Sequence, residues 1–272
     1  MHSVSRSDLT YHDYLKIPEL LSLQKPLSSP QQHDELLFIT IHQAYELWFK
    51  LILHELETAI ETMGEKNILR AHHFIHRTVQ IMKHLVQQIH LLETMTPADF
   101  LAFRQTLAPA SGFQSVQFRE IEFIAGLRGP EAQKYLTYFE NRPDLVATLR
   151  KRLASADLKS TYYNLLFSLG FDLPQNAAVL ELEEPEAIRP KIIQGILPIY
   201  QNPSNSLPLY LLSESLVEFD EYFALWREHH VRVVERIIGS KPGTGGSPGV
   251  EYLRSTTSKK CFPALWELRA QL

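Results

Sequence analysis

Long stretches of the chain place apolar residues three and four positions apart, the spacing of one face of an α-helix. The first stretch runs from about His33 to Met63, and its stripe consists of Phe38, His42, Tyr45, Phe49, Ile52 and Leu56. A second stretch follows shortly after Gly64, from Ile68 to Met95. Two long helices joined by so short a connection are expected to pack antiparallel.

Shorter helical patterns fill much of the remaining chain. Thr96 as an N-cap and Pro97 in the first turn predict a helix over 96–107, and 111–127 starts similarly. A third long helix is expected over about 209–238, whereas the proline-richer region 173–208 is predicted to be irregular. Because no segment alternates with the period of a strand, we expect one all-α domain over 1–272.

Composition narrows the class of protein. The 272 residues are 44% hydrophobic with a net charge of −4 and no block of like charges, which argues against nucleic acid as a partner. The single cysteine, Cys261, forbids a disulfide within the chain and favours the reducing cytoplasm. We expect no signal peptide, and the apolar stretch 36–56 carries too many polar residues for a membrane span.

The histidines are unevenly distributed, since ten of the twelve lie between His2 and His90 and the others are adjacent. His230 shares its predicted helix face with Trp226 and Val233, whereas the face of His229 is more polar. His230 is therefore predicted to point inward. A buried imidazole needs hydrogen bonds or a metal, and the commoner case is a hydrogen-bonded core histidine.

His42 lies in a similar aromatic stripe, and two such histidines on different helices suggest a shared pocket. His72 and His76 have an i, i+4 spacing that zinc can use, but no HExxH motif is present and a solvated helix face is the simpler interpretation. Haem suits the surroundings of His230 better, because it needs one imidazole and many apolar contacts.

Two further features could bind a ligand. Arg104 shares a helix face with Phe100, so its guanidinium would pair either with a carboxylate of the protein or with that of a substrate. The glycine-rich segment 241–249 follows a helix and lacks the lysine of a phosphate-binding loop. It is either a plain connection or a loop that folds over a ligand with Thr244 inward.

Several motifs together resemble the tryptophan 2,3-dioxygenase family. They occur in the family's order, while 127–205 matches less clearly; they are LTYHDYLKIPELLSLQ (9–24), HDELLFITIHQAYELWFK (33–50), FR (103–104), SGFQS (111–115), WRxxH (226–230) and GTGGSPGVEYLRST (243–256). The resemblance implies an all-helical fold around a haem pocket. It also implies one haem b per subunit, ferrous for activity, with His230 as the axial ligand.

The resemblance further assigns roles around that haem. It implies that His42 is the catalytic histidine of the distal pocket, that Arg104 holds the substrate carboxylate, and that Thr244 lies near its ammonium group. Ser111 and Gly112 match a segment beside the haem. The substrate contacts that it implies are Phe38, Ile39, Thr40, Ile41, His42 and Phe100, together with Tyr11, Tyr14 and Leu15 from a neighbouring subunit. The last three belong to an N-terminal segment, 1–25, that reaches across a homotetramer.

The implied reaction inserts both atoms of O2 across the indole C2–C3 bond of L-tryptophan and gives N-formyl-L-kynurenine. One departure is Phe100, which stands where members of the family often carry tyrosine. An alternative is therefore a related haem oxygenase that acts on another indole or aromatic amino acid. A haem-binding sensor and a helical scaffold with core histidines are two further alternatives.

Overall fold

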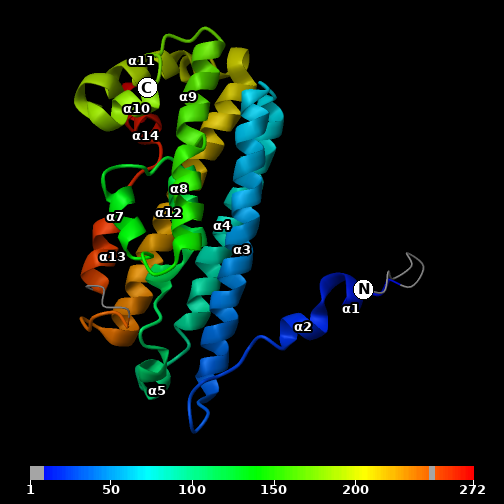
Figure 1. Cartoon of the computed structure of the whole chain (residues 1–272). Helices are drawn as coiled ribbons and strands as arrows, with labels where there is room; N and C mark the ends of the chain where they lie inside the picture. The colour runs from blue at the N-terminus through cyan, green and yellow to red at the C-terminus, as the bar shows by residue number, and fades with distance from the viewer. Residues whose placement is uncertain (1–8, 245–248) are drawn as a thin grey trace.

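Helices account for nearly all regular structure in residues 9–244 and 249–272, which the computed structural model describes (Figure 1). No strand occurs within these ranges, so the all-α prediction is confirmed. The helices are α1 (Tyr11–Leu15), α2 (Ile17–Leu21), α3 (His33–Gly64), α4 (Ile68–Leu92), α5 (Pro97–Arg104), α6 (Val116–Ile124), α7 (Glu131–Thr137), α8 (Pro143–Ala154), α9 (Leu158–Ser168), α10 (Ala177–Glu183), α11 (Pro185–Gln201), α12 (Leu207–Ile238), α13 (Val250–Thr256) and α14 (Pro263–Leu268).

The two long N-terminal helices, α3 and α4, pack antiparallel as expected. The Tyr45 hydroxyl donates to the carbonyl of Leu85 at 3.0 Å, and Arg77 donates to the buried carboxylate of Glu55 at 3.0 Å. Residue numbers rise along one helix as they fall along its partner, which fixes the antiparallel direction. The connection between the helices is only three residues long, so each helix covers the apolar stripe of the other.

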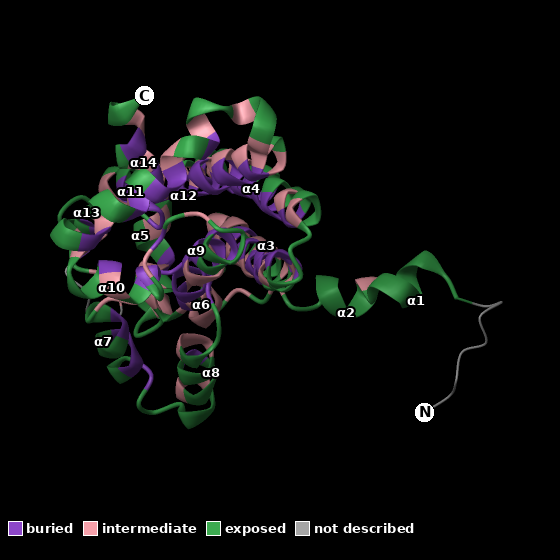
Figure 2. Cartoon of the chain, turned by 90° about the horizontal axis from the view of Figure 1, so that it is seen from above, coloured by how far each residue is buried: buried purple, intermediate pink, exposed green. Residues whose placement is uncertain are grey.

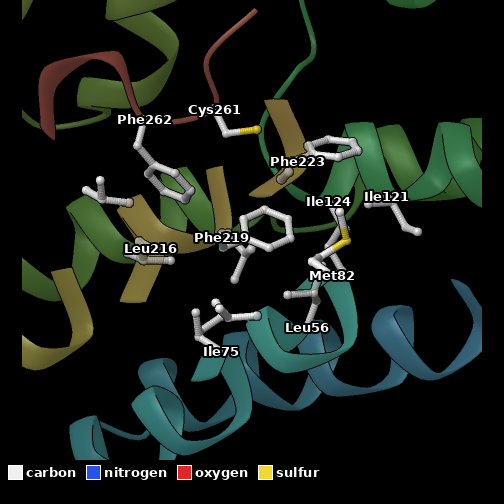
Figure 3. Packing of buried hydrophobic residues seen from close by; sticks show 14 of the residues in the cluster. Leu56, Ile75, Met82, Ile121, Ile124, Leu216, Phe219, Phe223, Cys261 and Phe262 are labelled. Atoms are coloured by element: carbon white, nitrogen blue, oxygen red, sulfur yellow. The ribbon is translucent and has the colours of Figure 1, made fainter. Parts of the chain in front are cut away.

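The third long helix, α12, runs beside α4 in the same direction. His72 lies 3.3 Å from the Ser215 hydroxyl, and Lys83 donates to Glu218 at 2.6 Å. The buried faces of α3, α4 and α12 turn toward one another when the bundle is viewed from above (Figure 2). Phe219 of α12 lies in the resulting core, above side chains of α3 and α4 (Figure 3).

The long apolar helix α3 is, by length and composition, the one helix among the described residues that could cross a membrane. Its inward side chains are buried against α4, and Glu55 on that buried side is paired with Arg77. The opposite side carries exposed polar residues such as Lys50. This two-sided pattern is typical of an amphipathic helix that packs through one face.

The prediction of an irregular region over 173–208 is wrong, because α10 and α11 occupy most of it. Pro190 and Pro198 lie inside α11 but on its exposed face, opposite buried residues such as Ile192 and Ile196. Each proline removes one backbone hydrogen bond, and the carbonyl that loses its donor lies on the solvent side. Water can satisfy these carbonyls, so the buried isoleucine stripe decides the structure.

Residues 9–32, before α3, project away from the helical body and are mostly exposed (Figures 1 and 2). The direction of this segment is fixed where it meets α3, because Glu35 accepts backbone hydrogen bonds from Leu27 at 2.7 Å and from Ser28 at 3.0 Å. Glu35 is 1% exposed, so this carboxylate is a buried anchor for the segment.

The C-terminal part of the chain is tied to α12 by one buried carboxylate. Asp220 accepts hydrogen bonds from the backbone nitrogens of Cys261 and Phe262 at 2.9 and 3.0 Å, and from the Trp266 indole nitrogen at 2.9 Å. These donors satisfy the carboxylate without a cation. Helix α14 is thereby held against the middle of the bundle.

Candidate active site

One large cavity opens between the long helices, beside α5 and α6 and the segment before α13. Its volume is about 260 Å³. Its lining includes Phe38, His42, Tyr45, Glu46, Phe49, Phe100, Arg104, Ser111, Gly112, Phe118, Arg119, Glu122, Trp226, Arg227, His230, Val233, Thr244 and Tyr252.

His230 reaches this cavity from α12, so the prediction that it points inward is confirmed. Its ring packs at 5.1 Å from the ring of Trp226, one turn earlier. Neither ring nitrogen of His230 has a hydrogen-bond partner within 9–244 and 249–272. The commoner interpretation, a hydrogen-bonded core histidine, is therefore not met. Burial, reinforced by nearby His42, lowers the pKa of His230 to about 4, which keeps the imidazole neutral and able to bind a metal.

His229 lies at the edge of the bundle, as its more polar face predicts. Its ring stands edge-on to the ring of His90 from α4, with 5.1 Å between the centroids. It does not line the cavity. Two adjacent histidines are thus separated by the 100° turn between neighbouring residues of a helix.

His42 faces the same cavity from α3. Its Nδ1 atom lies 2.7 Å from the carbonyl oxygen of Phe38 and is the donor, since a carbonyl can only accept. This tautomer leaves the lone pair on Nε2. Burial lowers the pKa of His42, and the hydrogen bond to Phe38 and the nearby Glu46 only partly oppose the shift.

Aromatic rings form much of the wall around His42. The ring of Phe38 lies 4.1 Å from that of His42, and the Phe100 ring lies 5.7 Å from Phe38. Phe103 is fully buried behind both phenylalanines, at 5.8 Å from Phe38. The rings form a slot that suits a flat apolar group such as an indole.

Arg104 and Thr244 approach the cavity from α5 and from the loop after α12. Arg104 donates to the carbonyl of Pro242 at 2.5 Å, and it has no ion pair with a carboxylate in the described part of the chain. The Thr244 hydroxyl donates to the carbonyl of Ala110 at 2.6 Å. Arg104 was expected to pair either with a carboxylate of the protein or with that of a substrate. The first of these two partners is not found among the described residues.

The loop that carries Thr244 is shaped by glycine at its far end. Gly249 has a φ of +67°, and a Cβ there would lie 2.6 Å from the carbonyl oxygen of Lys241. Only glycine allows this close approach, which brings the two ends of the loop together. Residues 245–248, which complete the glycine-rich motif, lie outside the described residues.

Ser111 and Gly112 reach the cavity through a capping box. The Ser111 hydroxyl accepts from the amide of Phe113, and the Gln114 side chain accepts from the amide of Ser111. These bonds fix the backbone where it approaches the cavity.

Other residues predicted to contact the substrate do not line this cavity. On α3, Thr40 is exposed and Ile41 is 3% exposed in the core, while Ile39 is half-buried outside the cavity. The helical period explains this, because the α3 residues that line the cavity recur three or four positions apart, as Phe38, His42 and Tyr45 do. The N-terminal residues are all exposed on the projecting segment; they are Tyr11, Tyr14 and Leu15.

A buried charged cluster at the cavity was not predicted from the sequence. Arg119 donates to Glu122 at 2.5 Å, and Arg227 donates to the other oxygen of Glu122 at 3.0 Å. Burial opposes ionisation of Glu122, but its two arginines and Lys259 outweigh it and lower the carboxyl pKa. Arg119 and Glu122 are three residues apart on a predicted helix, and this spacing could have indicated their ion pair. Their contact with Arg227 depends on tertiary packing and has no local signal.

The zinc-like spacing of His72 and His76 does not produce a metal centre. No group of three metal-binding side chains occurs in the ranges that the structure describes. His76 is exposed, and His72 hydrogen-bonds to Ser215. The solvated-face interpretation therefore suits His76, whereas His72 is half-buried against α12.

The fold and the cavity define a helical protein in which two neutral histidines on antiparallel helices face one aromatic pocket. The sequence profile of the family described as tryptophan 2,3-dioxygenase matches residues 1–166 and 186–272. The unmatched stretch falls in the middle region where the motifs are less clear. The chain belongs to the tryptophan 2,3-dioxygenase family.

Individual relatives agree with this membership. The tryptophan 2,3-dioxygenase of Nocardioides sp. is 46% identical over 98% of the chain and 96% of its own length. The protein of that name from Caulobacter vibrioides is 42% identical over 97% and 99%, and that from Bacillus anthracis is 38% identical over 100% and 96%. The similarity thus spans essentially the whole chain.

Proposed function

We propose that this protein is a haem-dependent dioxygenase that opens the indole C2–C3 bond of L-tryptophan with both atoms of O2. The product is N-formyl-L-kynurenine, which makes this the first step of tryptophan catabolism by the kynurenine route. The observation that carries the proposal is that His230, whose imidazole is neutral and not hydrogen-bonded in the described chain, faces His42 and Arg104 across one aromatic cavity.

Haem b fits the residues present at the cavity. His230 offers an unprotonated nitrogen, and its neighbours are aromatic and aliphatic, including Trp226 and Val233. His230 would hold the haem through its iron, with Ser111 and Gly112 bordering the same cavity. When bound in the ferrous state, one haem per subunit supplies the site that activates O2.

The chain's own residues bind and orient the substrate. His42 holds Nε2 as an acceptor, so it can take a hydrogen bond from the indole N–H. Phe38 and Phe100 form the aromatic slot, and Arg104 can hold the α-carboxylate through the N–H groups that do not bond Pro242. Thr244 would lie at the ammonium end. Together these groups prefer an amino acid to a bare indole and exclude water from the reacting atoms.

We further propose that the chain is a single functional domain that works as a cytoplasmic homotetramer. The projecting segment carries Tyr11, Tyr14 and Leu15, which are 70%, 72% and 41% exposed in one chain. Exposed aromatic residues on a segment with no core of its own favour a role against another subunit. They would complete the substrate pocket of a neighbour.

The test is an optical and isotopic one. The purified chain, supplied with haem, should show a Soret band that His230→Ala shifts or abolishes. The ferrous protein should then convert L-tryptophan under ¹⁸O₂ to a product that contains two labelled atoms. A product with one labelled atom would support the alternative of a related monooxygenase, and turnover only with another indole would correct the substrate. A chain that never acquires a Soret band would contradict the haem proposal itself.

A further inference from the structure

Three buried nitrogen atoms at the cavity wall have no hydrogen-bond partner in the described parts of the chain. They are Nε of Arg119, Nε of Arg227 and Nε1 of Trp226. Arg119 and Arg227 are only 5% and 3% exposed, and all three residues line the cavity. A buried donor without a partner costs about 1–3 kcal/mol, so an acceptor belongs next to this cluster.

The charge balance of the cluster gives the sign of that acceptor. Within the cluster two guanidinium groups share the single carboxylate of Glu122, which leaves one positive charge in excess there. The buried carboxylate of α12, Asp220, is instead bonded by Cys261, Phe262 and Trp266. The nearby ammonium group of Lys259 is paired with Glu131, so this pair adds no net charge. A buried excess charge is stable only beside a counter-ion, so the missing partner is an anion.

The faces of both guanidinium groups are already covered. Arg119 lies over the Tyr135 ring at 4.3 Å and the Phe113 ring at 4.9 Å, and Arg227 lies over Phe223 at 4.1 Å. Only edge N–H groups remain for a ligand. Edge donors of arginine match the planar geometry of a carboxylate.

We infer that Arg119 and Arg227 form an anchor for a carboxylate of the bound porphyrin, with Glu122 holding the two guanidinium groups in position. The inference rests on the proposed function, and it assigns a polar end to a cavity that is otherwise apolar. The orphaned donors are the observation that separates this anchor from an ordinary buried ion pair.

The carboxylate of tryptophan is a second source of the same chemistry, and the structure favours the porphyrin. Arg104, on α5, already offers a guanidinium without a carboxylate partner among described residues, beside the aromatic slot of Phe38 and His42. Arg227 instead lies on α12, three residues before His230. Substrate kinetics distinguish the two sources.

The experiment compares two porphyrins in the full-length chain, namely haem and haem dimethyl ester, whose carboxylates are blocked. Each is loaded into the wild type, Arg119→Gln and Arg227→Gln, and its loss to an excess of a haem-scavenging apoprotein is followed at the Soret band. In the wild type we expect the ester to leave at least tenfold faster than haem. In each variant haem should leave about ten- to a hundredfold faster, while the rate for the ester stays within about threefold.

Two results would overturn the assignment. Equal loss rates of haem and ester from the wild type would show that no carboxylate is held, and this comparison decides even if the variants fail to fold. Equal acceleration of both porphyrins in the variants would show a role in packing alone. A raised KM for tryptophan in Arg119→Gln, with unchanged haem loss, would reassign the anchor to the substrate. Absence of any Soret band in the wild type would instead contradict haem binding itself.

Discussion

The Nδ1 atom of His42 donates its proton to the backbone carbonyl of Phe38, 2.7 Å away and one turn earlier on α3. This bond fixes both the orientation of the imidazole and its tautomer, so Nε2 is left as an acceptor in the cavity. Because burial also lowers the pKa of His42, the ring stays neutral at physiological pH. His42 is thereby prepared to receive an N–H group.

His42→Ala should lower kcat/KM for L-tryptophan about tenfold, because one hydrogen bond to the indole N–H is lost. The same variant should hardly change kcat/KM for 1-methyl-L-tryptophan, which has no N–H at that position. Steady-state kinetics on both substrates measure this. An equal loss on both substrates would show that the contribution of His42 does not depend on the indole N–H.

Arg104→Gln should raise KM for L-tryptophan about ten- to a hundredfold, since a charge-assisted bond of about 1.5–3 kcal/mol is lost. Tryptamine lacks the carboxylate, so its KM should stay nearly unchanged. Arg150→Gln, at an exposed position of α8, is the matched control. If tryptamine and tryptophan were affected alike, the effect would come from the lost Pro242 contact and not from substrate binding.

Glu35→Gln should loosen the projecting segment in a pH-dependent way. Burial would raise the pKa of Glu35, but its bonds to Leu27 and Ser28 outweigh burial and lower the pKa below 4.5. The ionised carboxylate therefore contributes stability that is fully present above pH 4.5 and is lost as pH falls through the folded-state pKa.

Hydrogen exchange at the Leu27 and Ser28 amides measures this effect. At pH 7 the wild type should protect both amides more than the variant, by about 1–3 kcal/mol of opening free energy. The difference should shrink as the pH falls below 4.5. A difference that stays constant with pH would contradict the role of the ionised carboxylate.

Asp220→Ala should lower the free energy of unfolding by about 3 kcal/mol or more. It leaves the buried amides of Cys261 and Phe262 without an acceptor, and it frees α14 from α12. Denaturant unfolding measures the change. Asp144→Ala, which removes an exposed ion pair, is the control and should change stability by less than about 1 kcal/mol. Similar values for both variants would refute the importance of this buried anchor.

Some of the site could be predicted from local periodicity. The inward orientation of His230 and the outward position of His229 follow from the side chains one turn away, as does the cavity-facing pair of Phe38 and His42. The same periodicity argues against Ile39–Ile41 as cavity residues. In α11, by contrast, prolines suggested irregular structure, and burial of one isoleucine face outweighed them because the prolines lie toward solvent.

By itself the sequence determined which side of each helix is buried, because that depends only on residues three and four positions apart. It also determined which histidines face inward. Only the tertiary structure decided that Arg119 and Glu122 meet Arg227, and that Thr244 reaches the carbonyl of Ala110. These contacts join residues more than a hundred positions apart, so their geometry arises from the packing of α6 and α12 and of the loops beside them.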